Sequence, residues 1–396
     1  MAAASDSGAR EGLAILDIGL DRQLAARHME SESQARHAIY ARGLPARIVD
    51  IVKAAAGDSS EPLRLADGLV EVQPVPVSHW SFFPPRAVAA ASRLLSRRRF
   101  DVIQVQEPFL SGAAGLYLSR RYGLPLVAGA FSDQVDNPLW LAQRLLNRCA
   151  NPVGRLVYRG AAAIRADSRA VAERLRVMGY RGPRFVPFLI THASSLLRPA
   201  PEAAPLRSRL LGRCAGPLLL TVSRLEPEKN LPLLLDAFRR ARRSLPGLVL
   251  AVVGDGAERA RLEASAGSWG PECLRWVGWI PNDLLAAYYR AADLFLLGSN
   301  YESSPRVLTE ALLAGTPVLA TDTAGSRESV AEGVSGRIVP VGDVGAFAEA
   351  LVDLCSDRDG LARMGREGQA AAWSTAGTEA VLGGLRDLYA SVLGHP

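Results

Sequence analysis

Lysine is almost absent from this chain of 396 residues. Only Lys53 and Lys229 occur among its 46 basic residues, so arginine supplies nearly every cation. Because neither lysine follows a glycine, no GxxxxGK[ST] phosphate-binding loop exists, and the P-loop enzymes are excluded. A lysine that persists against such a background is a candidate functional residue.

The chain also has few cysteines and no long apolar run. The cysteines form no CxxC pair, which argues against a zinc site or a disulfide framework and favours buried, reduced thiols. They are Cys149, Cys214, Cys273 and Cys355. No stretch approaches the ~20 apolar residues of a membrane span, and the first ten residues lack the apolar core of a secretory signal. We therefore expect a cytoplasmic protein.

The net charge of +6 is carried by the first half of the chain. Residues 1–190 hold 25 basic and 17 acidic residues, whereas the remainder holds 21 and 23. An arginine cluster closes a predicted helix over residues 87–100, and such a cluster suits an anionic membrane surface, on the inner face of the plasma membrane. The alternative is an ordinary solvated helix end with favourably placed cations. The cluster consists of Arg93, Arg97, Arg98 and Arg99. We expect no nucleic-acid partner.

Apolar runs alternate with helical patterns along most of the chain. From Gly216 onward a short apolar run is followed by an amphipathic helical pattern six times, and the first half repeats this more loosely. Continuous apolar strands joined by helices predict a parallel sheet covered on both faces. The predicted fold class is therefore α/β, with two doubly wound, Rossmann-like domains that face each other across a cleft.

The domain boundaries follow from composition. We predict a flexible tail over residues 1–10 and an N-terminal domain over 11–196. A linker rich in proline and alanine follows over 197–215, and a C-terminal domain over 216–396, whose last helix packs back on the N-terminal domain. Ligands of such sheets bind at the carboxyl ends of the strands, so we expect the active site in the cleft.

A dinucleotide-binding fingerprint is only partly present. Gly254 and Gly256 supply two glycines of GxGxxG, but Arg259 stands at the third position. A tight turn that needs positive φ explains the two glycines equally well.

Two glutamates flank the predicted start of a helix between two buried strands. Ser304 is the expected N-cap and Pro305 the first helical residue, and the helix is expected to run to Gly315. The free amides and the dipole of such a helix start favour a phosphate. Ordinary chain rises separate Glu302 and Glu310 by about 10 Å, the reach of a diphosphate with a sugar at each end. Their carboxylates would accept hydrogen bonds from a hexose and a ribose.

Two cations follow the first strand of the C-terminal domain. Arg224 and Lys229 lie in TVSRLEPEKN, just past the carboxyl end of that strand. Charge-assisted contacts with a diphosphate contribute about 1.5 to 3 kcal/mol each, and more where charge develops in the transition state. The alternative is that Arg224 and Lys229 are solvated loop cations, and that Glu302 and Glu310 are exposed acids of a loop and a helix.

Taken together, these motifs resemble glycosyltransferase family 4, the retaining nucleotide-sugar transferases of the two-domain B-type fold. SRLEPEKN is similar to the family's G/S-R-L-x-x-E-K stretch, and Glu302 with Glu310 match its E-x7-E element. The resemblance implies that Arg224 and Lys229 bind the donor diphosphate and support the leaving group. It implies that Glu302 contacts hydroxyls of the donor sugar, with Ser303 and Ser304 beside it. Glu310 would contact the ribose.

The first half resembles transferases that build bacterial surface polysaccharides, through IGLDRQL, SESQARHAIYARGL and QEPFLSGAAGLYLSRRYGLPL. The resemblance makes Gly19, Phe131 and Asp133 candidate contacts of the donor sugar or acceptor. Phe131 stands where the family often has a histidine, and phenylalanine can neither donate a hydrogen bond nor carry a proton. The histidines receive no role, because isolated histidines are usually surface residues; they are His28, His37, His79, His192 and His395.

The activity that the resemblance implies is a metal-independent transfer without a cofactor. The donor would be a UDP- or GDP-linked hexose, and the acceptor a glycan, free or linked to a polyprenyl carrier, in cell-surface polysaccharide synthesis. The DxD at Asp357 and Asp359 is interpreted as a surface turn. Two alternatives stay open: a catalytically impaired binding protein on the same fold, and a sugar-nucleotide 2-epimerase.

Overall fold

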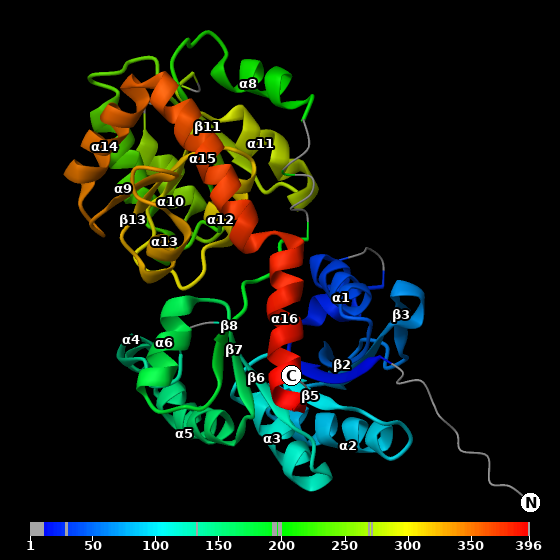
Figure 1. Ribbon diagram of the computed structural model, residues 1–396. Coiled ribbons are helices and arrows are strands. Elements are labelled where there is room, and N and C mark those ends of the chain that lie inside the picture. Colours follow the sequence, from blue (N-terminus) through cyan, green and yellow to red (C-terminus); the bar gives the residue numbers. More distant parts are fainter. Residues whose placement is uncertain are drawn as a thin grey trace, which may run out of the picture. The chain divides into compact units, whose positions relative to one another are not determined.

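The computed structural model describes residues 12–27, 31–131, 134–191, 196, 200–267, 270 and 272–394. The chain divides into two compact units (Figure 1). The N-terminal unit comprises residues 1–186 and 382–396, and the C-terminal unit comprises residues 187–381. In the part of the chain that the structure describes, no helix is both long and apolar enough to cross a bilayer.

The N-terminal unit is built on an eight-stranded sheet in the order β3-β4-β2-β1-β5-β6-β7-β8. Neighbouring strands are parallel except β3, a short antiparallel edge strand that the sequence pattern did not predict. The strands are β1 (Leu13–Gly19), β2 (Ala46–Ala55), β3 (Leu63–Leu65), β4 (Val70–Val77), β5 (Val102–Val105), β6 (Leu126–Ala130), β7 (Ala163–Ala166) and β8 (Pro183–Phe185).

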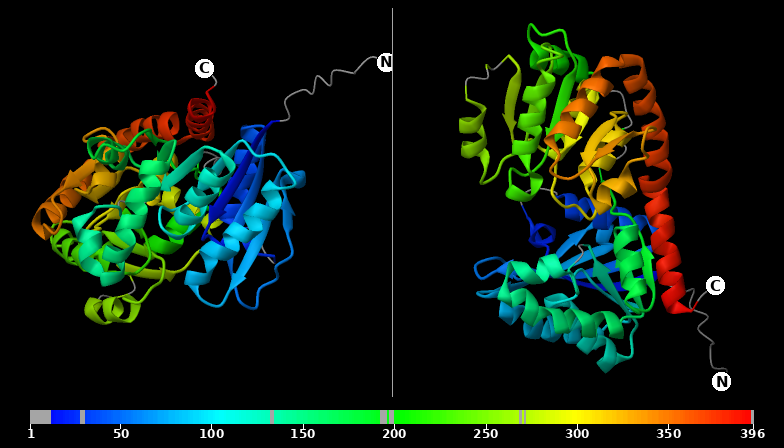
Figure 2. Two further views of the ribbon diagram at one scale, coloured as in Figure 1. Left: turned by 90° about the horizontal axis from the view of Figure 1, so that it is seen from below. Right: turned by 90° about the vertical axis from the view of Figure 1, so that its left-hand side faces the viewer.

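Helices cover both faces of this sheet (Figure 2). They are α1 (Glu32–Gly43), α2 (Phe83–Leu95), α3 (Leu110–Tyr122), α4 (Pro138–Gln143), α5 (Leu145–Gly160), α6 (Arg169–Val177) and α16 (Thr378–Leu393). Side chains alternate along β1, so Leu16 and Ile18 enter the core beneath α2, α3 and α5. On the opposite face α1 packs over β2, and α16 reaches β5 through a hydrogen bond from Tyr389 to Gln104 at 2.6 Å.

The C-terminal unit is a six-stranded parallel sheet in the order β11-β10-β9-β12-β13-β14. Its strands are β9 (Leu218–Val222), β10 (Val249–Val253), β11 (Leu274–Gly278), β12 (Leu294–Leu297), β13 (Val318–Thr321) and β14 (Gly336–Val339). Its helices are α8 (Ala203–Leu211), α9 (Leu231–Ala241), α10 (Arg259–Ala266), α11 (Leu285–Ala291), α12 (Arg306–Leu313), α13 (Ala324–Ser329), α14 (Val344–Ser356) and α15 (Arg358–Ala376). The six predicted strand–helix repeats and the α/β class are confirmed.

Three details differ from the predictions. The first segment of the N-terminal unit ends at residue 186 rather than 196, and the predicted linker over 197–215 contains helix α8, which packs on α11. The arginine-tipped helix ends at Leu95, and Arg98 beyond it pairs with Glu71 at 2.9 Å. The four cysteines are free, but Cys149 is exposed and Cys214 is half-buried, whereas Cys273 and Cys355 are buried as predicted.

Candidate active site

A pocket of about 360 Å³ lies at the carboxyl ends of β9, β10 and β12 in the C-terminal unit. Strand ends of a doubly wound sheet leave such a hollow because the following helices lead away to either face. Five of the six residues predicted to bind the donor line it, and Ser303 is not among the lining residues; the five are Arg224, Lys229, Glu302, Ser304 and Glu310. The structure thus brings most of the predicted C-terminal site together around one pocket.

Lys229 and Glu302 form an ion pair at this pocket. The Lys229 Nζ atom donates to Glu302 Oε1 at 2.6 Å, and Ser299 Oγ donates to the same oxygen at 2.7 Å. The two paired side chains are 18% and 12% exposed, so solvent screens the pair less than it screens a surface salt bridge. Both bonds go to Oε1, and among the described residues Oε2 accepts none. The pair therefore presents a cation and a carboxylate oxygen side by side.

Backbone contacts between two loops fix this geometry. Lys229 ends a short 3-10 turn, η4 (Pro227–Lys229), and Asn300 N donates to the carbonyl oxygen of Glu228 at 2.9 Å. The Asn230 side chain donates to Asn300 Oδ1 at 3.0 Å. The loop after β9 is thus joined to the loop after β12, which is why residues 73 positions apart in sequence meet.

Glu310 is buried at the pocket wall, with 5% of its surface exposed. Its Oε2 accepts a hydrogen bond of 2.8 Å from the hydroxyl of Tyr289 in α11. Burial, and then the Glu310 carboxylate, raise the pKa of Tyr289 well above its ordinary value, so the phenol stays a donor. The carboxylate is therefore held in one orientation before any ligand binds.

Helix α12 begins at Arg306, one residue later than predicted, and Pro305 is its N-cap in place of Ser304. Proline has no side-chain acceptor, so the N-cap residue makes no side-chain hydrogen bond to the first turn. The loop from Glu302 to Pro305 packs tightly against Gly325, whose amide donates to the Glu302 carbonyl oxygen at 2.9 Å. A Cβ at Gly325 would lie 2.7 Å from the carbonyl oxygen of Ser303, so only glycine fits there. The helix ends at Leu313, and Gly315 follows with φ of 83°.

Arg224 is held less firmly than Lys229. Its side chain is 73% exposed and bonds Glu228 Oε1 at 3.1 Å, an exposed contact between residues four apart. Such pairs contribute little in water. Arg224 is therefore free to turn toward an anion at small cost, whereas Lys229 is already positioned.

Gly254 adopts φ of 126°, which a residue with a side chain rarely reaches. A Cβ there would lie 1.9 Å from the carbonyl oxygen of Ser223. The turn after β10 therefore requires glycine at position 254 for its backbone shape, which confirms the tight-turn interpretation of Gly254; Gly256 has no positive φ, but a Cβ there would lie 2.5 Å from the carbonyl oxygen of Leu225.

Three pocket features were missed by the sequence reasoning. Tyr289 received no role, although it fixes Glu310. Trp279, just past β11, lines the pocket with 70% of its surface exposed. Arg306 also lines it, and its guanidinium carbon lies 5.3 Å from the ring centre of Phe188. The signal available in the sequence was a tryptophan near the end of the apolar run LRWVGWI, where ligands of such a sheet bind.

The predicted N-terminal residues lie at strand ends of the other sheet. Gly19 ends β1, where a Cβ would collide with the side chain of Gln106 at 2.1 Å. Phe131 follows β6, and the Arg165 guanidinium carbon lies 5.3 Å from the centre of its ring. Asp133 lies outside the described residues.

Comparisons with known proteins place the chain in a family. A family model described as "Glycosyl transferases group 1" matches residues 213–371, and one described as "Glycosyl transferase 4-like domain" matches residues 34–188. A GDP-mannose-dependent alpha-mannosyltransferase of Mycobacterium tuberculosis is 31% identical over 71% of this chain and 71% of its own. The lipopolysaccharide core biosynthesis glycosyltransferase LpsE of Rhizobium meliloti is 27% identical over 62% of this chain and 69% of its own.

Solved structures share the fold across the chain. Sucrose-phosphate synthase from Thermosynechococcus elongatus superposes with a TM-score of 0.79 at 22% identity, covering 96% of this chain and 99% of the other. Anabaena HepE in complex with UDP gives a TM-score of 0.74 at 21% identity, covering 96% and 100%. The fold is the B-type glycosyltransferase fold, and the chain belongs to the group 1, or family 4, glycosyltransferases, which move a sugar from a nucleotide sugar to an acceptor.

Proposed function

We propose that this glycosyltransferase transfers a hexose, with retention of configuration, from a UDP- or GDP-linked donor to a glycan or polyprenyl-linked glycan in cell-surface polysaccharide synthesis. The observation that carries the proposal is the Lys229–Glu302 pair, fixed at the wall of the C-terminal pocket. Relatives named as GDP-mannose-dependent and a neighbour whose structure holds UDP-glucose support a hexose on one of these nucleotides.

The donor diphosphate is proposed to bind between Lys229 and the start of α12. Lys229 supplies a positioned cation, and the backbone at the uncapped helix start supplies amide donors. Arg224 swings from its exposed contact with Glu228 to complete the clamp. A positive clamp on the departing nucleoside diphosphate stabilises the charge that develops as the glycosidic bond breaks.

The two glutamates are proposed to hold the sugars at either end of the diphosphate. Glu302 Oε2 accepts from hydroxyls of the hexose, since its Oε1 already serves Lys229 and Ser299. Glu310, locked by Tyr289, accepts from the ribose. A buried site built to accept hydroxyls discriminates strongly against ligands that lack them, because its oxygens would be left unpaired.

The chemical step needs few groups from the protein. The acceptor hydroxyl attacks the anomeric carbon from the face that the nucleoside diphosphate leaves, and the departing phosphate oxygen takes the hydroxyl proton. Arg224 and Lys229 supply the positive charge that a divalent ion supplies in other transferases, so we propose that transfer is metal-independent. Phe131 takes no part in proton transfer. We propose that its ring contacts the donor sugar or the acceptor, and that Gly19 and Asp133 make further contacts with the same ligands.

The acceptor is proposed to be reached at an anionic membrane surface through one face of the N-terminal unit. Helices α2, α3 and α5 cover that face, and none of them contains an aspartate or glutamate. Their cations are Arg86, Arg93, Arg120, Arg121, Arg148, Arg155 and Arg159. Arg155 is paired with Asp136, but the remaining arginines make this face basic, and such a face is attracted to anionic headgroups by about 1 kcal/mol per arginine near the surface.

Apolar side chains lie among these arginines. Leu145, Leu146 and Leu156 on α5 and Tyr117 on α3 are exposed. An open groove of about 600 Å³ between α3 and α5 is lined by Tyr117, Val153 and Leu156, with Arg120 and Arg121 at its edge. Exposed leucines and a tyrosine beside cations are typical of helices that lie in the membrane interface. This surface is a stronger candidate than the predicted arginine cluster alone, since Arg98 is paired with Glu71.

A thermal-shift screen of nucleotide sugars tests the proposal most simply. A ligand at 100 times its dissociation constant adds ~2.7 kcal/mol to the folded state, so one UDP- or GDP-hexose should raise the melting temperature. The enzyme should then hydrolyse that donor slowly in the presence of a metal chelator. NMR should show that the released hexose has the anomeric configuration of the donor. Isomerisation of the sugar would instead identify an epimerase. Absence of binding to every donor would support a catalytically impaired protein.

A further inference from the structure

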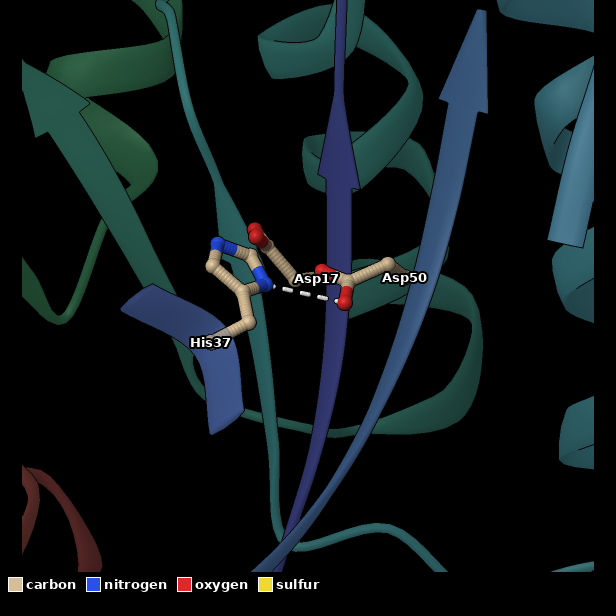
Figure 3. Close-up of side chains that lie close together, drawn as sticks. All are labelled: Asp17, His37 and Asp50. Atoms are coloured by element: carbon tan, nitrogen blue, oxygen red, sulfur yellow. Dashed lines mark hydrogen bonds and ion pairs between the residues drawn. The ribbon is translucent and has the colours of Figure 1, made fainter. Parts of the chain in front are cut away.

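Three buried side chains that can bind a metal converge in the N-terminal unit (Figure 3). They are Asp17 on β1, His37 on α1 and Asp50 on β2. One donor atom from each lies within 4.8 Å of the others, and His37 Nδ1 is 2.9 Å from Asp50 Oδ2. His37 was expected at the surface, so that interpretation of the histidine was wrong.

The sheet register explains why the two carboxylates meet. Asp17 and Asp50 are direct partners in the parallel ladder of β1 and β2, so their side chains emerge on the same face. The apolar neighbours of Asp17, Leu16 and Ile18, point to the other face and join the core there. Helix α1 packs over β2 and places His37 next to the two carboxylates.

Among the described residues, the two buried carboxylates have one contacting side chain that can carry a positive charge, the imidazole of His37. Asp17 and Asp50 are 1% and 0% exposed, and the Oδ1 atom of each has no hydrogen-bond partner among the described residues. Gln106 donates to Asp17 Oδ2 at 3.0 Å, a neutral contact. A protonated His37 would balance only one of the two negative charges, and a buried charge without a partner is costly, so the site favours a cation.

The neighbouring arginine does not fill this role. Arg36 precedes His37 on α1, but its guanidinium lies 3.8 Å from Asp21 and 3.9 Å from Glu32. Its Nη2 atom also donates to Ser33 Oγ at 2.9 Å. Its charge is therefore taken up by a separate group of acids.

We propose that Asp17, His37 and Asp50 bind one divalent transition-metal ion, for which Zn²⁺ is the best-suited probe. Two carboxylates neutralise the two charges of the ion, and a neutral imidazole adds a nitrogen ligand of the kind that such metals prefer over Mg²⁺ or Ca²⁺. Ligand atoms within 4.8 Å of one another reach a common ion at ~2.0 to 2.2 Å after small rotations of the side chains.

The role of this ion is structural. It joins β1, β2 and α1, three elements whose contacts otherwise consist of the strand ladder and helix packing. Gln106 orients Asp17 from the next loop, as groups that hold a metal ligand commonly do. The proposal is independent of the donor pocket, because all three ligands belong to the N-terminal unit.

The test uses the full chain, freed of metal by a chelator, mixed with Zn²⁺ and desalted. Atomic emission should find about one zinc per chain, and zinc should raise the melting temperature. The variants His37→Gln and Asp50→Asn should retain less than a tenth of that zinc. Co²⁺ should bind with weak visible bands and without thiolate absorption, because the ligands are nitrogen and oxygen.

Two matched controls separate this site from adventitious binding. His79→Gln removes an exposed histidine, and Cys149→Ser removes the exposed thiol; both should keep the zinc. Zinc that disappears with Cys149→Ser, or that stays in His37→Gln, would overturn the proposal. A wild-type chain that retains no zinc after desalting would overturn it without any variant, whether or not the variants fold.

Discussion

The hydroxyl of Tyr289 and the Oε2 atom of Glu310 lie 2.8 Å apart in the C-terminal unit, and both residues are buried. The tyrosine is wholly enclosed beside Phe295, while the glutamate reaches the pocket. A residue of the core thus sets the orientation of a residue proposed to bind the ribose.

Tyr289→Phe keeps the ring and its packing but removes this hydrogen bond. Because the buried carboxylate loses a donor, the free energy of unfolding should fall by about 1 to 3 kcal/mol, and the affinity for nucleotide should fall with it. Denaturant unfolding and calorimetry measure the two effects. Tyr288→Phe is the matched control on the same helix and should change neither. Equal behaviour of the two variants would show that Tyr289 does not position Glu310.

Trp279 is proposed to stack on the nucleobase. It lines the pocket with its indole largely exposed, and aromatic stacking on a base is worth about 1 to 3 kcal/mol. Trp279→Ala should therefore raise the nucleotide dissociation constant by about 5- to 150-fold. Nucleotide should also quench tryptophan fluorescence in the wild type and much less in Trp279→Phe. Quenching that persists in Trp279→Phe but vanishes in Trp373→Phe would place the base elsewhere.

The fold was largely predictable, because its signals are local. Each strand of the C-terminal unit is an apolar run followed by an amphipathic helix, and the period of the pattern reports both. Lys229 and Glu302 were found because each lies in a short motif next to a strand end. Helix α8 was missed because proline and alanine around residues 200–205 suggested a linker, whereas Leu206 and Leu210 bury one face of a helix.

The features that escaped prediction depend on contacts between distant segments. Tyr289 is one of two adjacent tyrosines, and the sequence does not say which of them faces inward. Asp17, His37 and Asp50 meet only because β1 and β2 pair in register and α1 crosses over them. The N-cap of α12 moved to Pro305 because the preceding loop packs against Gly325, a contact that no local rule contains.

Charge reversal and removal of apolar side chains test separately the arginines and the exposed leucines of the proposed membrane-binding face. Arg120→Glu with Arg121→Glu, and separately Leu145→Ser with Leu156→Ser, should each reduce binding to anionic liposomes by about tenfold or more. Arg97→Glu with Arg99→Glu, at the cluster predicted from sequence, should have a smaller effect. Arg243→Glu in the C-terminal unit is the control. Cosedimentation at low salt measures all four, and binding that none of them weakens would exclude this face.

Acid should destabilise the N-terminal unit through Asp136. Burial opposes ionisation of this carboxyl, but hydrogen bonds from Asn151 and Arg155 outweigh it and lower its pKa. A lowered folded-state pKa gives stability that is present above the unfolded value of about 4 and is lost as the pH falls through the folded value. In Asp136→Asn, the melting temperature should fall less steeply below pH 4 than it does in the wild type. Asp67→Asn, at an exposed site, should show the same dependence of melting temperature on pH as the wild type. A decrease below pH 4 in Asp136→Asn that is as steep as in the wild type would contradict the role given to Asp136.

Calorimetric titration of UDP and GDP into Lys229→Ala tests the central claim most directly, since the other lysine, Lys53, lies in β2 and supplies a matched control. A charge-assisted contact of about 1.5 to 3 kcal/mol predicts that the dissociation constant of the better nucleotide rises by about 10- to 150-fold in Lys229→Ala. Lys53→Ala should bind as the wild type does. The same dissociation constant in Lys229→Ala and Lys53→Ala would mean that the diphosphate does not bind at the Lys229–Glu302 pair.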